Sequence, residues 1–130
     1  MIHQFKLRVY YEDTDLAGIV YYANYLKFIE RARSEFVREL GIDQTVLKDR
    51  DGLVFAVRRV EADYLSPAKF DNQLDVETSV LSVSGARLVL KQDVKRGTTL
   101  LFRANVTLIA LKTDGRAARL PADIRLIFGE

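Results

Sequence analysis

The sequence predicts an α+β fold in which an antiparallel sheet curls around one long helix. One run with helical periodicity comes early in the chain, and four long strand-like runs follow it. An early helix followed by consecutive strands is typical of α+β folds with an antiparallel sheet. No second run of helical spacing has a comparable length, which argues against a ferredoxin-like arrangement. The 130 residues fit a single domain, residues 1–130.

The first two elements are a strand and the long helix. Residues 5–11 alternate apolar and polar side chains, as a half-buried strand does. Apolar side chains then recur at helical spacing, and most of the intervening positions are charged or polar. Gly41 suits the position that ends a helix, so the helix is expected from about Tyr22 to Leu40.

The rest of the chain reads mainly as strands. Residues 43–50 form a short helical turn or a loop, and residues 124–128 form a helical turn or an edge strand. Turn-forming residues, such as Ser84-Gly85, separate the runs. The four expected strands are 53–64, 73–83, 86–95 and 98–112.

Long edge strands would be pairing hazards in an isolated domain of this kind. Residues 74–83 and 99–111 are the examples that the sequence suggests. Edge-to-edge pairing of two chains removes such a hazard, so a homo-oligomer is expected.

Composition excludes most kinds of catalytic centre. The chain has no cysteine and a single histidine, His3, close to the N-terminus. It therefore lacks thiolate nucleophiles and the several imidazole or thiolate ligands of a zinc site, and a Ser-His-Asp triad would depend on His3. Neither a metal nor a cofactor is expected. Carboxylates and tyrosines remain as the acid–base groups.

Charge and hydropathy narrow the class of partner. The net charge is +2, from 20 basic and 18 acidic residues, which is too balanced for general nucleic-acid binding. A mild positive excess suits a phosphorylated ligand or an acidic carrier protein. No apolar run approaches the roughly 20 residues of a membrane-spanning helix. The N-terminal residues lack the apolar region of a signal peptide, so a cytoplasmic location is expected.

One loop concentrates the residues that could perform chemistry. Residues 11–18 read Tyr-Glu-Asp-Thr-Asp-Leu-Ala-Gly and lead directly into the long helix. A carboxylate beside the free N-terminal amides of a helix can attack a carbonyl while the amides stabilise the charge that develops on oxygen. Asp and Gly also build turns and cap helices, so a purely structural loop remains the alternative. The aromatic neighbours and the lack of another catalytic set favour the chemical role.

This loop resembles the signature of the 4-hydroxybenzoyl-CoA thioesterase family of hotdog-fold proteins. The similarity spans residues 11–25, Tyr-Glu-Asp-Thr-Asp-Leu-Ala-Gly-Ile-Val-Tyr-Tyr-Ala-Asn-Tyr, and continues through Glu30-Arg31-Ala32-Arg33. Residues 64–74 and Leu120-Pro121 resemble later parts of the family pattern. Within the family, the chain looks most like the acyl-CoA thioesterases associated with the Tol-Pal cell-envelope system of Gram-negative bacteria.

The resemblance implies one central helix wrapped by a five- to six-stranded antiparallel sheet, with active sites between the subunits of a homodimer or homotetramer. It implies hydrolysis of an acyl-CoA or acyl-carrier-protein thioester to a free acid and a thiol. The family's catalytic carboxylate falls on Asp15, which acts as nucleophile or as general base. The family's carbonyl-polarising backbone amide falls on Tyr22, and Asp13 is then expected to order the loop.

Further residues are assigned from the same resemblance. Gly18, Tyr21 and Asn24 are expected at the substrate site, with a core position for Tyr21 and a helix cap for Asn24 as alternatives. Arg87 lies at the hairpin turn where the hydroxybenzoyl enzymes gather basic residues, and it would face the phosphates of coenzyme A. Glu30-Arg31 is expected to be a structural ion pair. Other cations considered for the phosphates are Arg58, Arg59, Lys91 and Arg96.

The chain departs from its branch at Tyr22, where many members have a histidine. A backbone role survives this change, so hydrolysis stays the expectation, but the substrate preference of the branch need not carry over. A non-catalytic acyl-CoA-binding or regulatory protein on the same fold is the alternative function. A dehydratase of this fold would need a histidine, and His3 is poorly placed for it.

Overall fold

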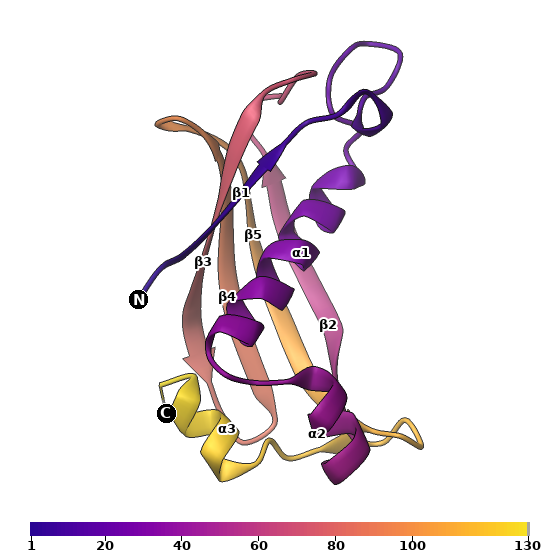
Figure 1. Cartoon of the computed structure of the whole chain (residues 1–130), viewed down its shortest axis with the longest axis vertical. Coiled ribbons are helices and arrows are strands. Elements are labelled where there is room, and N and C mark those ends of the chain that lie inside the picture. The colour runs from indigo at the N-terminus through magenta and orange to yellow at the C-terminus, as the bar shows by residue number, and fades with distance from the viewer. Residues whose placement is uncertain (130) are drawn as a thin grey trace.

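One face of an antiparallel sheet carries the long helix α1, Asn24–Glu39 (Figure 1). The computed structural model describes residues 1–129. The strand order is β1-β3-β4-β5-β2, and the short strand β6 pairs with β5. This is the predicted α+β arrangement of one central helix against a six-stranded sheet. Within residues 1–129, no helix is long and apolar enough to cross a membrane.

Most elements lie where the sequence predicts them. The strands are β1 (His3–Arg8), β2 (Leu53–Tyr64), β3 (Gln73–Val83), β4 (Arg87–Arg96), β5 (Thr99–Lys112) and β6 (Ala117–Ala118). The remaining helices are η1 (Tyr11–Asp13, a 3-10 turn), α2 (Gln44–Asp51) and α3 (Ala122–Ile127). The four long strands agree with their predicted bounds to within one residue. Two segments had alternative predictions, residues 43–50 as a helical turn or a loop and residues 124–128 as a helical turn or an edge strand. Both are helical, in α2 and α3.

Helix α1 is shorter than predicted by two residues at its start and one at its end. Its start is delayed by a turn in which the N–H of Asn24 donates to the carbonyl of Tyr21 at 2.8 Å. The helix ends before Gly41, as expected. Gly41 has φ +88°, a left-handed conformation that glycine adopts without steric cost.

The core lies between α1 and the inner face of the sheet. Phe28 and Phe36 of α1 are buried there, as are Leu90 of β4 and Phe102 of β5. Tyr25, in the first turn of α1, stacks on Phe102 with ring centroids 5.0 Å apart. This stacking fixes the start of the helix against the sheet.

A polar side chain lies within this apolar core. Gln92 of β4 is fully buried, and its Nε2 donates to the carbonyl of Ile29 at 2.9 Å and to Thr78 Oγ1 at 3.0 Å. Its Oε1 accepts a hydrogen bond from Arg33 Nη1 at 3.1 Å. Burial lowers the pKa of Arg33. The bridge joins α1 to β3 and β4 and satisfies both ends of the buried amide.

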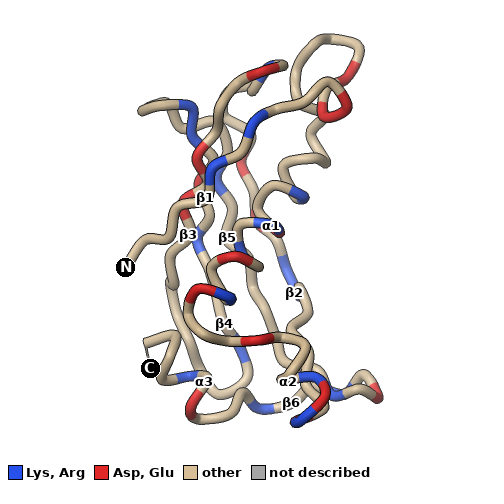
Figure 2. Tube along the Cα trace, viewed as in Figure 1, with Lys and Arg blue, Asp and Glu red and all other residues tan. Residues whose placement is uncertain are grey.

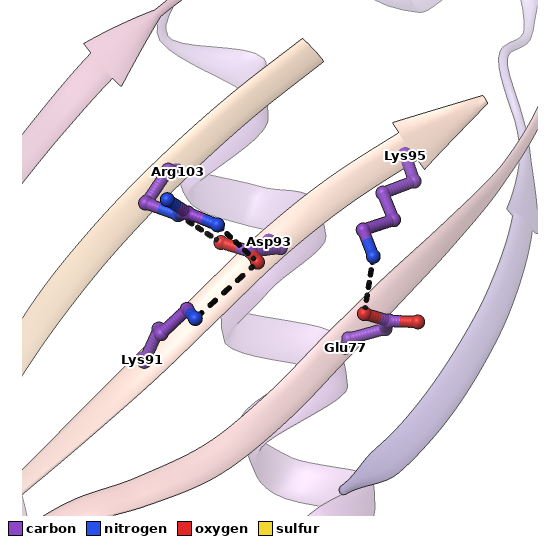
Figure 3. Close-up of polar contacts among 5 residues, drawn as sticks. All are labelled: Glu77, Lys91, Asp93, Lys95 and Arg103. Atoms are coloured by element: carbon purple, nitrogen blue, oxygen red, sulfur yellow. Dashed lines mark hydrogen bonds and ion pairs between the residues drawn. The ribbon is translucent and has the colours of Figure 1, made fainter. Parts of the chain in front are cut away.

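The opposite face of the sheet carries paired charges (Figure 3). Asp93 of β4 accepts two hydrogen bonds from Arg103 of β5, at 2.8 and 3.0 Å, and Lys91 Nζ lies 3.9 Å from its carboxylate. Glu77 of β3 pairs with Lys95 of β4 at 2.8 Å. The hydrogen bond to Asp93 raises the pKa of Arg103, and the hydrogen bond to Glu77 raises that of Lys95. Charge pairs therefore link the three inner strands.

The edges of the sheet are β1 and β2. The suggestion that residues 74–83 and 99–111 form edges was wrong, because β3 lies between β1 and β4, and β5 lies between β4 and β2. Strand β1 covers only the first half of β3. Strand β2 is the longer free edge, and its residues 57–64 are exposed.

Candidate active site

The acidic loop is a tight turn that presents Asp15 at the surface. The N–H of Asp15 donates to the carbonyl of Ile19 at 2.9 Å, and the N–H of Gly18 donates to the carbonyl of Asp15 at 3.0 Å. One carboxylate oxygen, Oδ1, accepts from the N–H of Ala17 at 2.9 Å. Gly18 has φ +79°, which only glycine adopts readily. The carboxylate is thus oriented by the turn while remaining exposed to a ligand.

Asp13 holds the same loop together from within. Its Oδ2 accepts the N–H of Tyr10 at 2.8 Å. Its carbonyl accepts the N–H of Tyr21 and the side-chain Nδ2 of Asn24, both at 2.9 Å. The expected loop-ordering role of Asp13 is confirmed. Asn24 does not cap the helix: Ala23 occupies the N-cap position, and the amide of Asn24 ties α1 to the loop instead.

The backbone N–H of Tyr22 is directed away from the helix. It belongs to the same peptide group as the Tyr21 carbonyl, which accepts the N–H of Asn24 at 2.8 Å. The carbonyl and N–H of a trans peptide point in opposite directions, so the N–H of Tyr22 faces outward. No acceptor for it lies within residues 1–129. A free donor at the positive end of a helix is suited to polarising a carbonyl.

Tyr22 also lines an apolar pocket. The pocket has a volume of about 320 Å³ and lies between residues 19–25 on one side and residues 64–67 on the other. The second wall is tied to the first, because the N–H of Val20 donates to the carbonyl of Ala68 at 2.9 Å. The N–H of Ala68 in turn donates to Tyr25 Oη at 3.0 Å. The two walls therefore form one unit beside the acidic loop.

Tyr64 and Tyr25 are site residues that the sequence did not single out. Tyr64 ends β2, and its hydroxyl donates to the carbonyl oxygen of Tyr22 at 2.9 Å. Both tyrosines line the pocket, and burial raises the pKa of each. Tyr64 begins the segment 64–74 that resembles the family pattern, which was the available signal. A tyrosine at the end of a strand carries no pattern of its own.

The structure separates Arg87 from the other predicted site residues. Arg87 begins β4 beside the 84–86 hairpin, at the opposite end of the sheet from the acidic loop, whose carboxylates are marked in Figure 2. The length of β3 separates the two ends, roughly 30 Å at the rise of a strand. Arg87 therefore does not reach Asp15 within one chain. Tyr21, by contrast, packs its ring against that of Tyr22 with centroids 5.0 Å apart.

Two other charged candidates, Glu30 and Arg96, have structural partners. Glu30 accepts from Ser34 Oγ at 3.2 Å, and no Glu30–Arg31 ion pair occurs within residues 1–129. The predicted pair was wrong because adjacent residues on a helix point in different directions. Arg96 Nη1 donates to the carbonyl of Pro67 at 3.2 Å, so this cation lies against the wall of the pocket. No group of three or more His, Cys, Asp or Glu in the described part of the chain could hold a metal ion.

Comparisons with known proteins agree on one family. A family model described as "Thioesterase superfamily" matches residues 17–102. The acyl-CoA thioesterase YbgC of Haemophilus influenzae is 46% identical over 102 residues, which are 78% of this chain and 75% of that protein. The acyl-CoA thioester hydrolase YbgC of Escherichia coli O6:H1 is 38% identical over 127 residues, 95% of this chain and 92% of that protein. A probable thioesterase from Bartonella henselae has a solved structure with a TM-score of 0.89 and 40% identity, covering 93% of this chain and 100% of that one.

Proposed function

Because the chain belongs to the thioesterase superfamily, we propose that Asp15 and the backbone N–H of Tyr22 form the catalytic centre of an acyl-CoA thioesterase. The hotdog fold and acyl-CoA thioester hydrolysis follow from the similarity to relatives that are 38 to 46% identical. The assignment of the reaction to particular residues is the proposal. It rests on the geometry of the acidic loop.

One observation carries this assignment. An exposed carboxylate and an N–H that has no acceptor within residues 1–129 occur in a single loop, and several backbone hydrogen bonds hold that loop in shape. The apolar pocket that Tyr22 lines suits the acyl part of a thioester. The acidic loop and the start of α1 therefore supply an oxygen nucleophile or base and a carbonyl-polarising donor, and the residue that owns this donor also lines an acyl-sized apolar pocket.

In the proposed reaction, the thioester oxygen accepts a hydrogen bond from the Tyr22 N–H. This donor, at the positive end of α1, stabilises the negative charge that develops on the oxygen. Asp15 either attacks the carbonyl carbon itself or takes a proton from the water that attacks. In both cases the C–S bond breaks, water supplies the hydroxyl group of the free acid, and coenzyme A leaves as the thiol.

We propose further that the working unit is at least a dimer joined along β2. This is the longer free edge of the sheet, and the apolar side chains of Val57 and Val60 are exposed on it. Antiparallel pairing of two β2 strands about a two-fold axis reverses one sheet relative to the other. The end of one sheet that carries the 84–86 hairpin then lies beside the end of the other sheet that carries the acidic loop. Arg87 of one subunit then lies at the acidic loop of the other, where it can bind the phosphates of coenzyme A.

Release of free thiol from acyl-CoA substrates tests the proposed function. We expect thiol release from a panel of short, long and aromatic acyl-CoAs, each assayed with and without the protein. The same acyl groups on an acyl carrier protein identify the preferred donor. Saturable binding of acyl-CoA without thiol release would contradict the proposal and would indicate a non-catalytic acyl-CoA-binding protein.

A further inference from the structure

We infer that Tyr64 is a positioning residue whose hydroxyl holds the turn that directs the Tyr22 N–H at the thioester carbonyl. The inference rests on the proposed function, since it concerns the donor that polarises the substrate. Tyr64 does not itself contact the reacting atoms. It acts on them through the backbone of Tyr22.

The Tyr22 carbonyl is held by Tyr64 in place of the helix. In a regular α-helix the N–H four residues later, that of Leu26, would donate to this carbonyl. Here the Leu26 N–H donates to the carbonyl of Ala23 at 3.2 Å. The Tyr64 hydroxyl donates to the Tyr22 carbonyl instead, at 2.9 Å. A side chain from β2 thus completes the start of α1.

The hydrogen bond from Tyr64 restrains the backbone rotation at Tyr22, which the other hydrogen bonds leave free. Upstream of the catalytic N–H, Tyr21 is fixed at both its N–H and its carbonyl, by Asp13 and Asn24. Downstream, the next carbonyl is that of Tyr22, and its bond to Tyr64 is the restraint on that side. With both sides held, the N–H between them keeps one direction, as pre-organised transition-state stabilisation requires.

The ring of Tyr64 is itself fixed by aromatic packing. It contacts Phe102 with ring centroids 5.0 Å apart, Tyr25 at 5.5 Å and Tyr22 at 6.1 Å. These contacts come from β5, from α1 and from the turn, so the hydroxyl cannot shift without moving its neighbours. Burial raises the pKa of Tyr64, and the nearby Tyr22 and Tyr25 act in the same direction. The hydroxyl therefore keeps its proton, and its donor role, at neutral and mildly alkaline pH.

Replacing Tyr64 by phenylalanine tests the role with the ring retained. We expect Tyr64→Phe to lower kcat about 3- to 10-fold, the effect of losing one hydrogen bond, with KM changed less than about twofold. The matched control is Tyr11→Phe. Tyr11 is 81% exposed and its hydroxyl makes no hydrogen bond within residues 1–129, so wild-type kinetics are expected. A Tyr64→Phe protein with the kcat of the wild type would overturn the inference.

The stretching frequency of the bound thioester carbonyl gives a readout that a merely structural role would not move. In an Asp15→Asn background, which should bind without turnover, we expect bound acyl-CoA to show a lowered carbonyl frequency caused by the Tyr22 N–H. Adding Tyr64→Phe should make this shift smaller, so that the carbonyl frequency of bound acyl-CoA moves back toward that of free acyl-CoA. An identical shift in the two proteins would contradict the positioning role.

A variant that retains both ring and hydroxyl covers the case in which Tyr64→Phe folds poorly. Replacing Tyr64 by 3,5-difluorotyrosine acidifies the hydroxyl, so loss of kcat on the alkaline side should begin at a lower pH than in the wild type. If kcat began to fall at the same alkaline pH as in the wild type, the result would contradict the inference. Failure of the wild-type protein to release thiol would instead refute the proposed function, so the two failures are distinguishable.

Discussion

At the scale of single residues, Asp13 and Asp15 differ in what their carboxylates bind. The Asp13 side chain accepts the N–H of Tyr10, and its carbonyl is used twice to hold the start of α1. The Asp15 carboxylate accepts one N–H, that of Ala17, and is otherwise open to solvent. A carboxylate that already serves the loop is a poor candidate for covalent or proton-transfer chemistry. The difference therefore supports the reacting role that we propose for Asp15.

The raised pKa values of Tyr25 and Tyr64 predict a loss of stability at alkaline pH. The folded chain holds both protons more tightly than the unfolded chain does. Their contribution is therefore complete below the ordinary tyrosine pKa of 10.0 and is lost as the pH rises through the higher folded values. Lys95, whose pKa is also raised, acts with the same sign.

We therefore expect the free energy of unfolding, measured in urea, to fall as the pH is raised from about 9 to about 11. The Tyr64→Phe protein lacks one of these groups, so its stability should fall less over the same range. A fall as steep in the variant as in the wild type would show that Tyr64 contributes nothing to the dependence.

Part of the site could be predicted from the sequence because it is contiguous. Asp15, Gly18 and Tyr22 lie in one motif that leads into a helix, and the loop forms as expected. Tyr64 could not be predicted, because its contact with the Tyr22 carbonyl spans 42 positions and depends on which strand ends beside α1. Gln92 is similar, since a buried amide within an apolar strand is satisfied only by partners on other elements.

At the scale of elements, the charge pairs on the outer face of the sheet differ in strength. Asp93 is 7% exposed at its side chain and accepts two hydrogen bonds from Arg103, whereas Asp75 lies 3.8 Å from an exposed Lys6. Short, two-point bonds to a buried carboxylate contribute more than a single exposed contact. The pairing of β4 with β5 should therefore depend on Asp93.

We expect Asp93→Asn to lower the free energy of unfolding by about 1 to 2 kcal/mol, because it removes the charge that binds a half-exposed Arg103. Asp75→Asn is the matched control, with an expected loss below about 0.5 kcal/mol. Urea denaturation of the two variants gives the comparison. Equal losses would mean that burial does not distinguish the two pairs.

The bounds of the four long strands were predictable, whereas the first strand was expected at residues 5–11 and lies at His3–Arg8, and the order of the strands in the sheet was not predictable. Alternation and turn residues identify the long strands to within a residue, because they reflect local burial and backbone conformation. Strand order depends on contacts between distant segments. Residues 74–83 and 99–111 therefore looked like edges although β1 and β2 flank them.

At the scale of the whole molecule, the position of Arg87 makes a partner subunit part of the proposed site. We expect light scattering to give a molar mass of at least twice the 14.8 kDa of one chain. Val60→Asp places a charge on the exposed edge of β2 and should shift the protein toward monomer, because the dimer would bury that charge. The variant should lose affinity for acyl-CoA in parallel, since each site loses the partner's Arg87.

A monomeric wild-type protein that retains full activity would contradict both the dimer and the role of Arg87. Arg87→Ala in a dimeric protein provides the control. It should raise KM for acyl-CoA while leaving the molar mass unchanged, because Arg87 lies two strands away from the β2 edge.

The most direct test of the account compares two carboxylates of the same loop. Asp15→Asn removes the proposed reacting group, and Glu12→Gln removes an equal charge from an exposed neighbour. With acyl-CoA as substrate, we expect kcat/KM to fall at least about 100-fold in Asp15→Asn and to stay near the wild-type value in Glu12→Gln, with both proteins folded. An Asp15→Asn protein that retains wild-type turnover would contradict the account.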